Sequence, residues 1–214
     1  NIIGSNISNI GLVLGLSAIL KPIQVQYRNS KFDLLFLCAI SFLLVVFCEY
    51  YYLSRLVGVF FLLCLIIYLK ILITTQNVIQ DRKKDNSSLF FLILIILVSS
   101  VMLFVGTHYF IKGAKGIANI LGINDTVIGL TIIAFGTSAP ELAASFIAIK
   151  KQDFEIILGN IIGSNIFNIL AVLGLTTIIN PIIVQRNILG ILIIFILLTL
   201  FLPIIIYFRN KLSR

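Results

Sequence analysis

The sequence predicts an all-α polytopic membrane protein built around an inverted-topology repeat, and three observations support this fold class. Of the 214 residues, 60% are apolar or aromatic and 11% are charged, whereas a soluble domain is nearer half apolar and a quarter charged. The apolar residues gather in seven runs, each near the roughly 20 residues that a helix needs to cross a bilayer. Finally, one segment of 26 residues occurs twice. The composition therefore argues against a water-soluble enzyme.

Polar connections separate the seven predicted spans. The spans are 2–20, 34–53, 56–75, 89–111, 126–149, 155–179 and 188–208. The connections are 21–33, a short turn at 54–55, 76–88, 112–125, 150–153 and 180–187. The longest strongly polar connection, 76–88, is predicted to link two halves that comprise residues 1–75 and 89–214.

The basic residues orient the protein. The chain has 16 basic and 8 acidic residues, which give a net charge of +8. When the spans alternate across a bilayer, twelve basic residues fall on one side and four on the other. Because cytoplasmic loops carry the excess of Lys and Arg, we expect loops 21–33, 76–88 and 150–154 and the C-terminus to be cytoplasmic. The lipid bilayer, and no nucleic acid, is the partner that this charge pattern indicates.

The duplicated segment comprises residues 1–26 and 160–185. At an offset of 159, 18 of 26 positions are identical, and the shared polar residues include Ser5, Asn6 and Asn9. Five spans separate the starts of the two copies, so the copies cross the membrane in opposite directions. Inverted repeats are typical of secondary transporters, whose sites lie near the membrane midplane between the repeats.

The fifth run contains a carboxylate in a predicted span. Glu141 there costs roughly 2.5–3.5 kcal/mol on insertion scales, and a bound hard cation, which prefers oxygen ligands, would offset that cost. Thr137 and Ser138 lie four and three residues before Glu141 and share its helix face. Since Pro140 lacks a backbone donor and Gly136 lies beside it, we expect the helix to bend or break there.

The sixth run adds a polar stripe, because Asn160, Ser164 and Asn168 recur every four residues. Ser5 and Asn9 repeat part of this pattern in the first run. Small and polar residues in a spanning helix can also serve close helix packing. Duplication beside a helix with a Glu favours a site for Na⁺ or Ca²⁺. The three cysteines lie inside apolar runs, and we expect no cofactor.

At this point the sequence resembles a known family. Residues 127–174 carry G-T-S-x-P-E and G-N-x-x-G-S-N-x-x-N, and they resemble the second repeat of the calcium/cation antiporter superfamily, the sodium/calcium exchangers. The resemblance implies a fold of ten spanning helices in two inverted halves. Residues 1–75 would then be helices 3–5 of the first repeat, and residues 89–214 helices 6–9 of the second. The first two helices and the last would be absent.

The resemblance also implies a ligand set. The metal-binding residues that it indicates are Ala134 (through its carbonyl), Thr137, Ser138, Glu141, Ser164, Asn168, Ser5 and Asn9. The partner Glu would precede residue 1, so we expect an incomplete site and little transport from the chain as given. Some exchangers carry Asp where this chain has Asn168, which leaves one charge fewer in the site.

The function expected from these features is that of an antiporter and not of an enzyme. It would export Ca²⁺ in exchange for Na⁺ across a bacterial plasma (inner) membrane by alternating access. A proton-coupled or K⁺-dependent Ca²⁺ antiporter is the nearest alternative. An intramembrane serine protease would use Ser138 with His108 as its base, but it explains neither Glu141 nor the duplicated asparagines, and His108 is interpreted as an interfacial residue near a helix end. A non-transporting scaffold is a further alternative.

Overall fold

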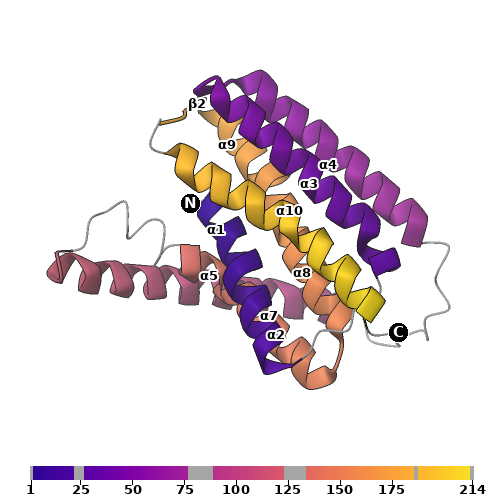
Figure 1. Ribbon diagram of the computed structural model, residues 1–214. Helices are drawn as coiled ribbons and strands as arrows, with labels where there is room; N and C mark the ends of the chain where they lie inside the picture. The colour runs from indigo at the N-terminus through magenta and orange to yellow at the C-terminus, as the bar shows by residue number, and fades with distance from the viewer. Residues whose placement is uncertain (1, 22–26, 77–88, 123–133, 186–187, 213–214) are drawn as a thin grey trace.

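The computed structural model describes residues 2–21, 27–76, 89–122, 134–185 and 188–212, and these are nearly all helical (Figure 1). Two long helices carry the duplicated segments, and each has three successive parts. The first consists of α1 (Ile2–Ser8), η1 (Asn9–Leu14) and α2 (Gly15–Leu20); the second consists of α8 (Phe154–Phe167), η3 (Asn168–Leu173) and α9 (Gly174–Ile179).

The middle part of each repeat helix, η1 or η3, is π-helical. Asn9 and Asn168, which begin these parts, are related by the repeat offset of 159, and each part ends before a glycine. A π-helix bonds i to i+5, so its turn holds an extra residue, and such turns frequently mark functional sites. The two copies therefore share a local distortion as well as a sequence.

Of the bend or break predicted at Gly136 and Pro140, the break is wrong, because α7 (Ala134–Lys151) is helical through both residues, and the bend stays a prediction. Pro140 lies inside the helix, where it cannot donate to the Gly136 carbonyl. Gly136 has a packing role, since a Cβ there would lie 2.8 Å from Ile111 Cγ1 of α5. The regular α-helix is interrupted in the repeat helices instead.

Helix α5 (Leu89–Ile120) is longer than predicted, and it continues for nine residues beyond the predicted end at Ile111. Apolar residues continue at helical spacing through Ile117, and the helix ends only where Gly122 adopts a left-handed φ of 69°. At 1.5 Å per residue, 32 residues span about 48 Å. A bilayer core is about 30 Å thick, so this helix must tilt or extend beyond it. Figure 1 shows α5 crossing the direction of the bundle.

Three further helices complete the bundle: α3 (Tyr27–Glu49), α4 (Arg55–Gln76) and α10 (Leu189–Leu212). Helix α3 begins seven residues before the predicted span and ends four residues before its predicted end. The early end has a local cause, because Tyr51 takes a positive φ of 55°. The chain then forms β1 (Tyr52–Leu53), which pairs antiparallel with β2 (Ile182–Ile183).

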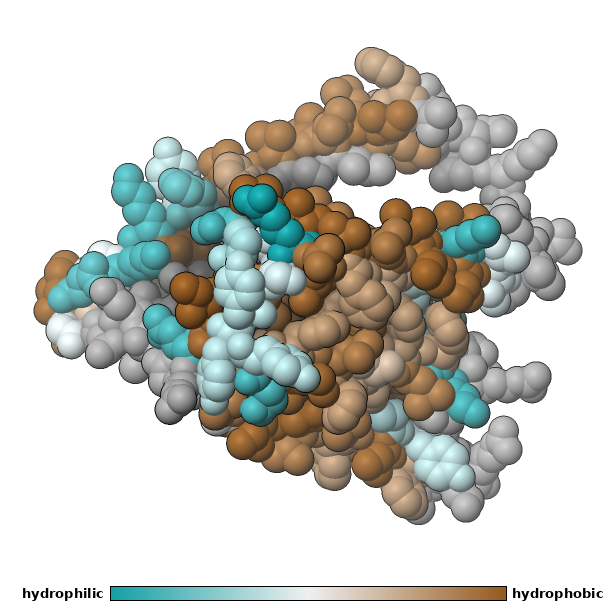
Figure 2. Space-filling view, turned by 90° about the horizontal axis from the view of Figure 1, so that it is seen from above, coloured by the Kyte–Doolittle hydropathy of each residue, from teal (hydrophilic) through white to brown (hydrophobic). Residues whose placement is uncertain are grey.

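The outer surface is apolar, as the fold class requires. Six helices in the described part of the chain are long and apolar enough to cross a membrane: Ile2–Leu20, Ser30–Glu49, Arg55–Thr75, Phe90–Ile120, Phe154–Ile179 and Leu189–Phe208. Figure 2 shows apolar side chains over much of the face in view. The remaining predicted span, 126–149, begins outside the described residues, and its described part is in α7.

The packing brings the two repeat helices together. Helix α1 contacts α7, α10 and η3, while α8 contacts α3, α7 and η1. On the far side of the second repeat helix, α4 packs closely on α9, where a Cβ on Gly58 would lie 2.6 Å from the Gly174 carbonyl oxygen. The polar stripes of both repeats therefore face each other inside the bundle.

Candidate cation site

The crossing of the two repeat helices buries amide side chains that are identical in both copies. Asn6 and Asn165 are 0% exposed and Asn9 is 1% exposed. Their neighbours along each helix are mainly Ile, Leu, Val and Gly, so the amides form the polar stripe of an otherwise apolar helix. Because buried polar groups require partners, the bonds of these amides specify how the repeats meet.

The amides bond crosswise between the repeats. Asn9 Nδ2 donates to Asn165 Oδ1 at 3.0 Å, and Asn168 Nδ2 donates to Asn6 Oδ1 at 3.0 Å. These two bonds are equivalent, because the repeat offset converts residues 9 and 165 into 168 and 6. Asn6 Nδ2 also donates to the backbone carbonyl of Asn165 at 3.4 Å. The pseudo-two-fold symmetry of the sequence is thus present in the hydrogen bonds.

Helix α7 adds hydroxyl groups to the same place. The hydroxyl oxygens of Ser5 and Thr137 lie 2.6 Å apart, and Ser138 Oγ donates to the Ser5 backbone carbonyl at 3.3 Å. Ser138 is 1% exposed. Three hydroxyls from helices 132 residues apart in the sequence therefore meet beside the amide cluster.

Glu141 lies one turn beyond these hydroxyls on the same helix. Its carboxyl group interacts with the Ser164 hydroxyl, and its backbone carbonyl accepts from Asn160 Nδ2 at 3.4 Å. Among the atoms of this site, two buried acceptors, Glu141 Oε2 and Asn9 Oδ1, and one buried donor, Asn165 Nδ2, have no hydrogen-bond partner in the described part of the chain. Unpartnered buried acceptors are costly, and a cation bound by oxygen atoms would satisfy them.

The structure brings most of the predicted ligands together. Ser5 meets Thr137 and Ser138, Glu141 meets Ser164, and Asn9 and Asn168 each bond an asparagine of the other repeat. Ala134 is the first residue of α7. The bridging residues that we did not predict as site residues are Asn6, Asn165 and Asn160. Identity between the two copies is the signal that could have selected Asn6 and Asn165.

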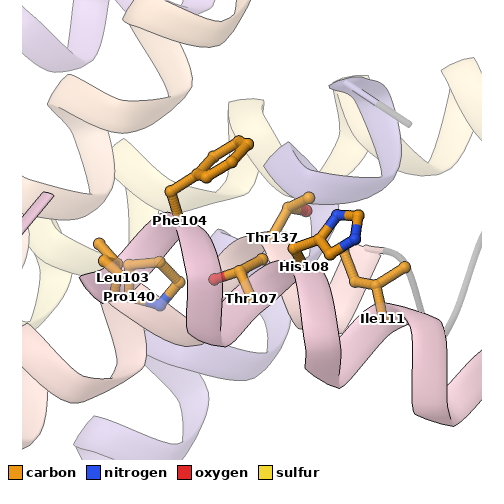
Figure 3. A pocket seen from close by; sticks show the side chains of 7 residues that line it. All are labelled: Leu103, Phe104, Thr107, His108, Ile111, Thr137 and Pro140. Atoms are coloured by element: carbon orange, nitrogen blue, oxygen red, sulfur yellow. The ribbon is translucent and has the colours of Figure 1, made fainter. Parts of the chain in front are cut away.

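A cavity of about 430 Å³ lies between α5 and α7. Its lining residues are Leu103, Phe104, Thr107, His108, Ile111, Thr137 and Pro140 (Figure 3). The position of His108 near a helix end was the wrong prediction, since α5 continues for twelve residues after it. Thr137 belongs to both the cavity wall and the cluster of hydroxyls. The Ser138 hydroxyl donates to a backbone carbonyl instead of to His108, which is not the arrangement of a serine nucleophile and its base.

The ligand atoms present at this site suit a hard cation. Among the described residues, no three His, Cys, Asp or Glu side chains gather as a metal cluster. The atoms that do gather are hydroxyl, amide, carboxylate and carbonyl oxygens, which Na⁺ and Ca²⁺ accept and which transition metals do not favour.

Comparison with known proteins identifies the family to which this site belongs. The sequence model of the family described as sodium/calcium exchanger protein matches residues 1–74 and 91–214. The chain belongs to the sodium/calcium exchanger family. A putative antiporter, CaxA of Alkalimonas amylolytica, is 38% identical over 195 residues, which are 86% of this chain. The sodium/calcium exchanger MaX1 of Methanosarcina acetivorans is 46% identical over 81 residues, 38% of this chain and 23% of that protein.

A solved exchanger structure confirms the fold class. The sodium-calcium exchanger NCX_Mj of Methanococcus jannaschii, soaked with Na⁺ and Sr²⁺, superposes with a TM-score of 0.78 at 35% identity. The similarity covers 96% of this chain and 67% of the NCX_Mj chain. The chain spans 61% of the length of CaxA. This exchanger chain therefore corresponds to about six-tenths of its curated relative.

Proposed function

We propose that the complete protein exports Ca²⁺ across the plasma membrane in exchange for Na⁺ by alternating access. The observation that carries this proposal is Glu141 Oε2, a buried acceptor without a hydrogen-bond partner among the described residues. It lies on a helix whose neighbouring hydroxyls bond to the other repeat. Membership of the sodium/calcium exchanger family supports Ca²⁺ and Na⁺ as the transported ions.

In this proposal Glu141 supplies the charge, and neutral oxygens complete the coordination. The hydroxyls of Thr137, Ser138, Ser5 and Ser164, the amide oxygens of Asn9 and Asn168 and the Ala134 carbonyl are the proposed neutral ligands. Because the ions share these oxygens, the binding of one displaces the other. In the orientation that the basic residues predict, loops 21–33, 76–88 and 150–154 are cytoplasmic. Export then carries Ca²⁺ away from the side on which these loops lie.

The energetics require coupling. Moving the two charges of Ca²⁺ outward against 100 mV costs roughly 4.6 kcal/mol, because each charge costs about 2.3. Each tenfold concentration ratio adds about 1.4 kcal/mol. Na⁺ entering down its own gradient and the same potential offsets these terms, so exchange of the two ions needs no chemical fuel.

The test is ⁴⁵Ca²⁺ uptake by inverted vesicles that contain the protein expressed from its complete gene. Vesicles loaded with Na⁺ should accumulate Ca²⁺, and Glu141→Gln, which removes the charge at constant size, should abolish accumulation. Glu49→Gln is the matched control, because Glu49 is the last residue of α3 and is not among the proposed ligands. Uptake that ignores the Na⁺ gradient but follows a pH gradient would establish proton coupling, and an absolute need for K⁺ would establish the K⁺-dependent alternative. Uptake that responds to neither gradient would refute antiport.

A further inference from the structure

An amide that binds a cation must be held in one of its two orientations. Only the Oδ1 side of a carboxamide accepts, whereas the Nδ2 side carries two donors and repels a cation. A carboxylate offers an oxygen whichever way it faces. Asn168 is an amide among the proposed ligands, so it needs a device that fixes its orientation.

A series of hydrogen bonds supplies that device. The backbone carbonyl of Asn165 can only accept, so the side chain of Asn6 must present Nδ2 to it, and it does so at 3.4 Å. The Oδ1 atom of Asn6 is then left to face Asn168 and can only accept from it. Asn168 Nδ2 donates to this oxygen at 3.0 Å. In a planar amide the Oδ1 atom of Asn168 is consequently directed away from Asn6.

We infer that Asn6 is a positioning residue that holds the Asn168 carboxamide with its oxygen toward the cation. This inference rests on the proposed function. Its counterpart in the other repeat is Asn165, whose Oδ1 accepts from Asn9 Nδ2 at 3.0 Å. There the outcome is visible, because Asn9 Oδ1 is a buried oxygen without a partner among the described residues. Asn165 Nδ2, unlike Asn6 Nδ2, has no hydrogen-bond partner among the described residues, so the positioning role is assigned to Asn6 alone.

A purely structural role is the alternative, since buried asparagines also hold spanning helices together. The two roles differ in what happens when the ligand no longer needs orienting. Asn168→Asp replaces the amide with two equivalent oxygens. A positioning residue then becomes dispensable for affinity, whereas a residue that only holds the helices together is needed in both backgrounds.

The experiment measures ⁴⁵Ca²⁺ binding and Ca²⁺-dependent thermal stabilisation of the purified complete gene product in detergent. Asn6→Leu, which is similar in size but cannot hydrogen bond, should weaken Ca²⁺ binding by about 10–100-fold, as is usual when the partner of a metal ligand is lost. In the Asn168→Asp background the same change should not lower Ca²⁺ affinity, because a carboxylate at position 168 cannot donate to the Asn6 Oδ1 atom that faces it. An equal loss in both backgrounds, or a loss in neither, would overturn the assignment of Asn6.

A second arm guards against failure of Asn6→Leu to fold. Asn6→Ala, which removes the amide without adding apolar bulk, should weaken Ca²⁺ binding in the natural sequence and should not weaken it in the Asn168→Asp background. If Asn6→Ala weakens binding equally in both backgrounds, positioning is refuted without the leucine variant. If wild-type protein binds Ca²⁺ but the variants contradict these expectations, only the positioning role is refuted. Wild-type protein that binds no Ca²⁺ refutes the proposed function as well.

Discussion

The close approach of α4 and α9 gives a graded prediction about stability. A Cβ added to Gly58 would lie 2.6 Å from the Gly174 carbonyl oxygen and 3.1 Å from the Ile178 backbone nitrogen. Ordinary contact begins at 3.4 Å, so the carbonyl would have to retreat by 3.4 − 2.6 = 0.8 Å. Backbone atoms cannot rotate away, and the two helices must separate.

The same arithmetic ranks the related substitutions. A Cβ on Gly174 would lie 3.2 Å from the Gly58 carbonyl oxygen, so that oxygen would have to retreat by only 3.4 − 3.2 = 0.2 Å. A Cβ on Gly190 would have nothing within 4 Å. Since overpacking costs typically about 1–3 kcal/mol, we expect about 2–3 for Gly58→Ala, below about 1 for Gly174→Ala and no cost for Gly190→Ala.

Thermal unfolding in detergent, followed by fluorescence-detected size exclusion, measures this series. For a chain of this size 1 kcal/mol corresponds to about 2–4 °C, so Gly58→Ala should melt roughly 4–12 °C below wild type. Gly190→Ala should melt with wild type. A Gly58→Ala protein as stable as wild type, or a Gly174→Ala protein that is the less stable of the two, would refute the inference that backbone contact limits the approach of these helices.

Two further predictions concern hydrogen bonds of α7 and α8. Ser5→Ala and Thr137→Val should each destabilise the protein, and the double variant should lose about 1 kcal/mol less than their sum, because either change removes their shared bond of 2.6 Å; strict additivity in thermal melts would contradict the bond. The side chain of Asp153 caps α8 by accepting from the Ile156 backbone N–H, so Asp153→Ala should cost about 1 kcal/mol, whereas Asp153→Asn should retain most of the stability. Equal melting temperatures for the two variants would argue against the cap.

The membrane architecture was predictable from sequence because hydropathy acts over whole spans. Runs of about 20 apolar residues need no knowledge of neighbours, and the described helices overlap all seven predicted runs. Helix ends were less predictable, because they depend on single residues. The end of α3 follows from the positive φ of Tyr51 and from the pairing of β1 with β2, and the end of α5 follows from the positive φ of Gly122. From composition alone, neither Tyr51 nor Gly122 can be distinguished from the other tyrosines and glycines of the chain.

The candidate site was predictable in its residue types and not in its bonds. Repetition selected Ser5 and Asn9, and a carboxylate in an apolar run selected Glu141. The crosswise pairing of Asn6 with Asn168 depends on how two helices cross, which no local pattern encodes. Pro140 shows the same limit of local rules: a proline inside a helix removes one backbone hydrogen bond, yet α7 remains helical through it.

The paired π-helical turns also bear on the history of the chain. A turn of this kind holds one residue more than an α-helical turn, so the insertion of one residue into an α-helix would produce it. Both wide turns start at the same asparagine of their copies and both comprise six residues. The simplest account is a single insertion in an ancestral half-length gene, followed by duplication. The widened turn would then be older than the two-fold symmetry around it, and it would have been inherited, together with its asparagine, by both halves of the exchanger.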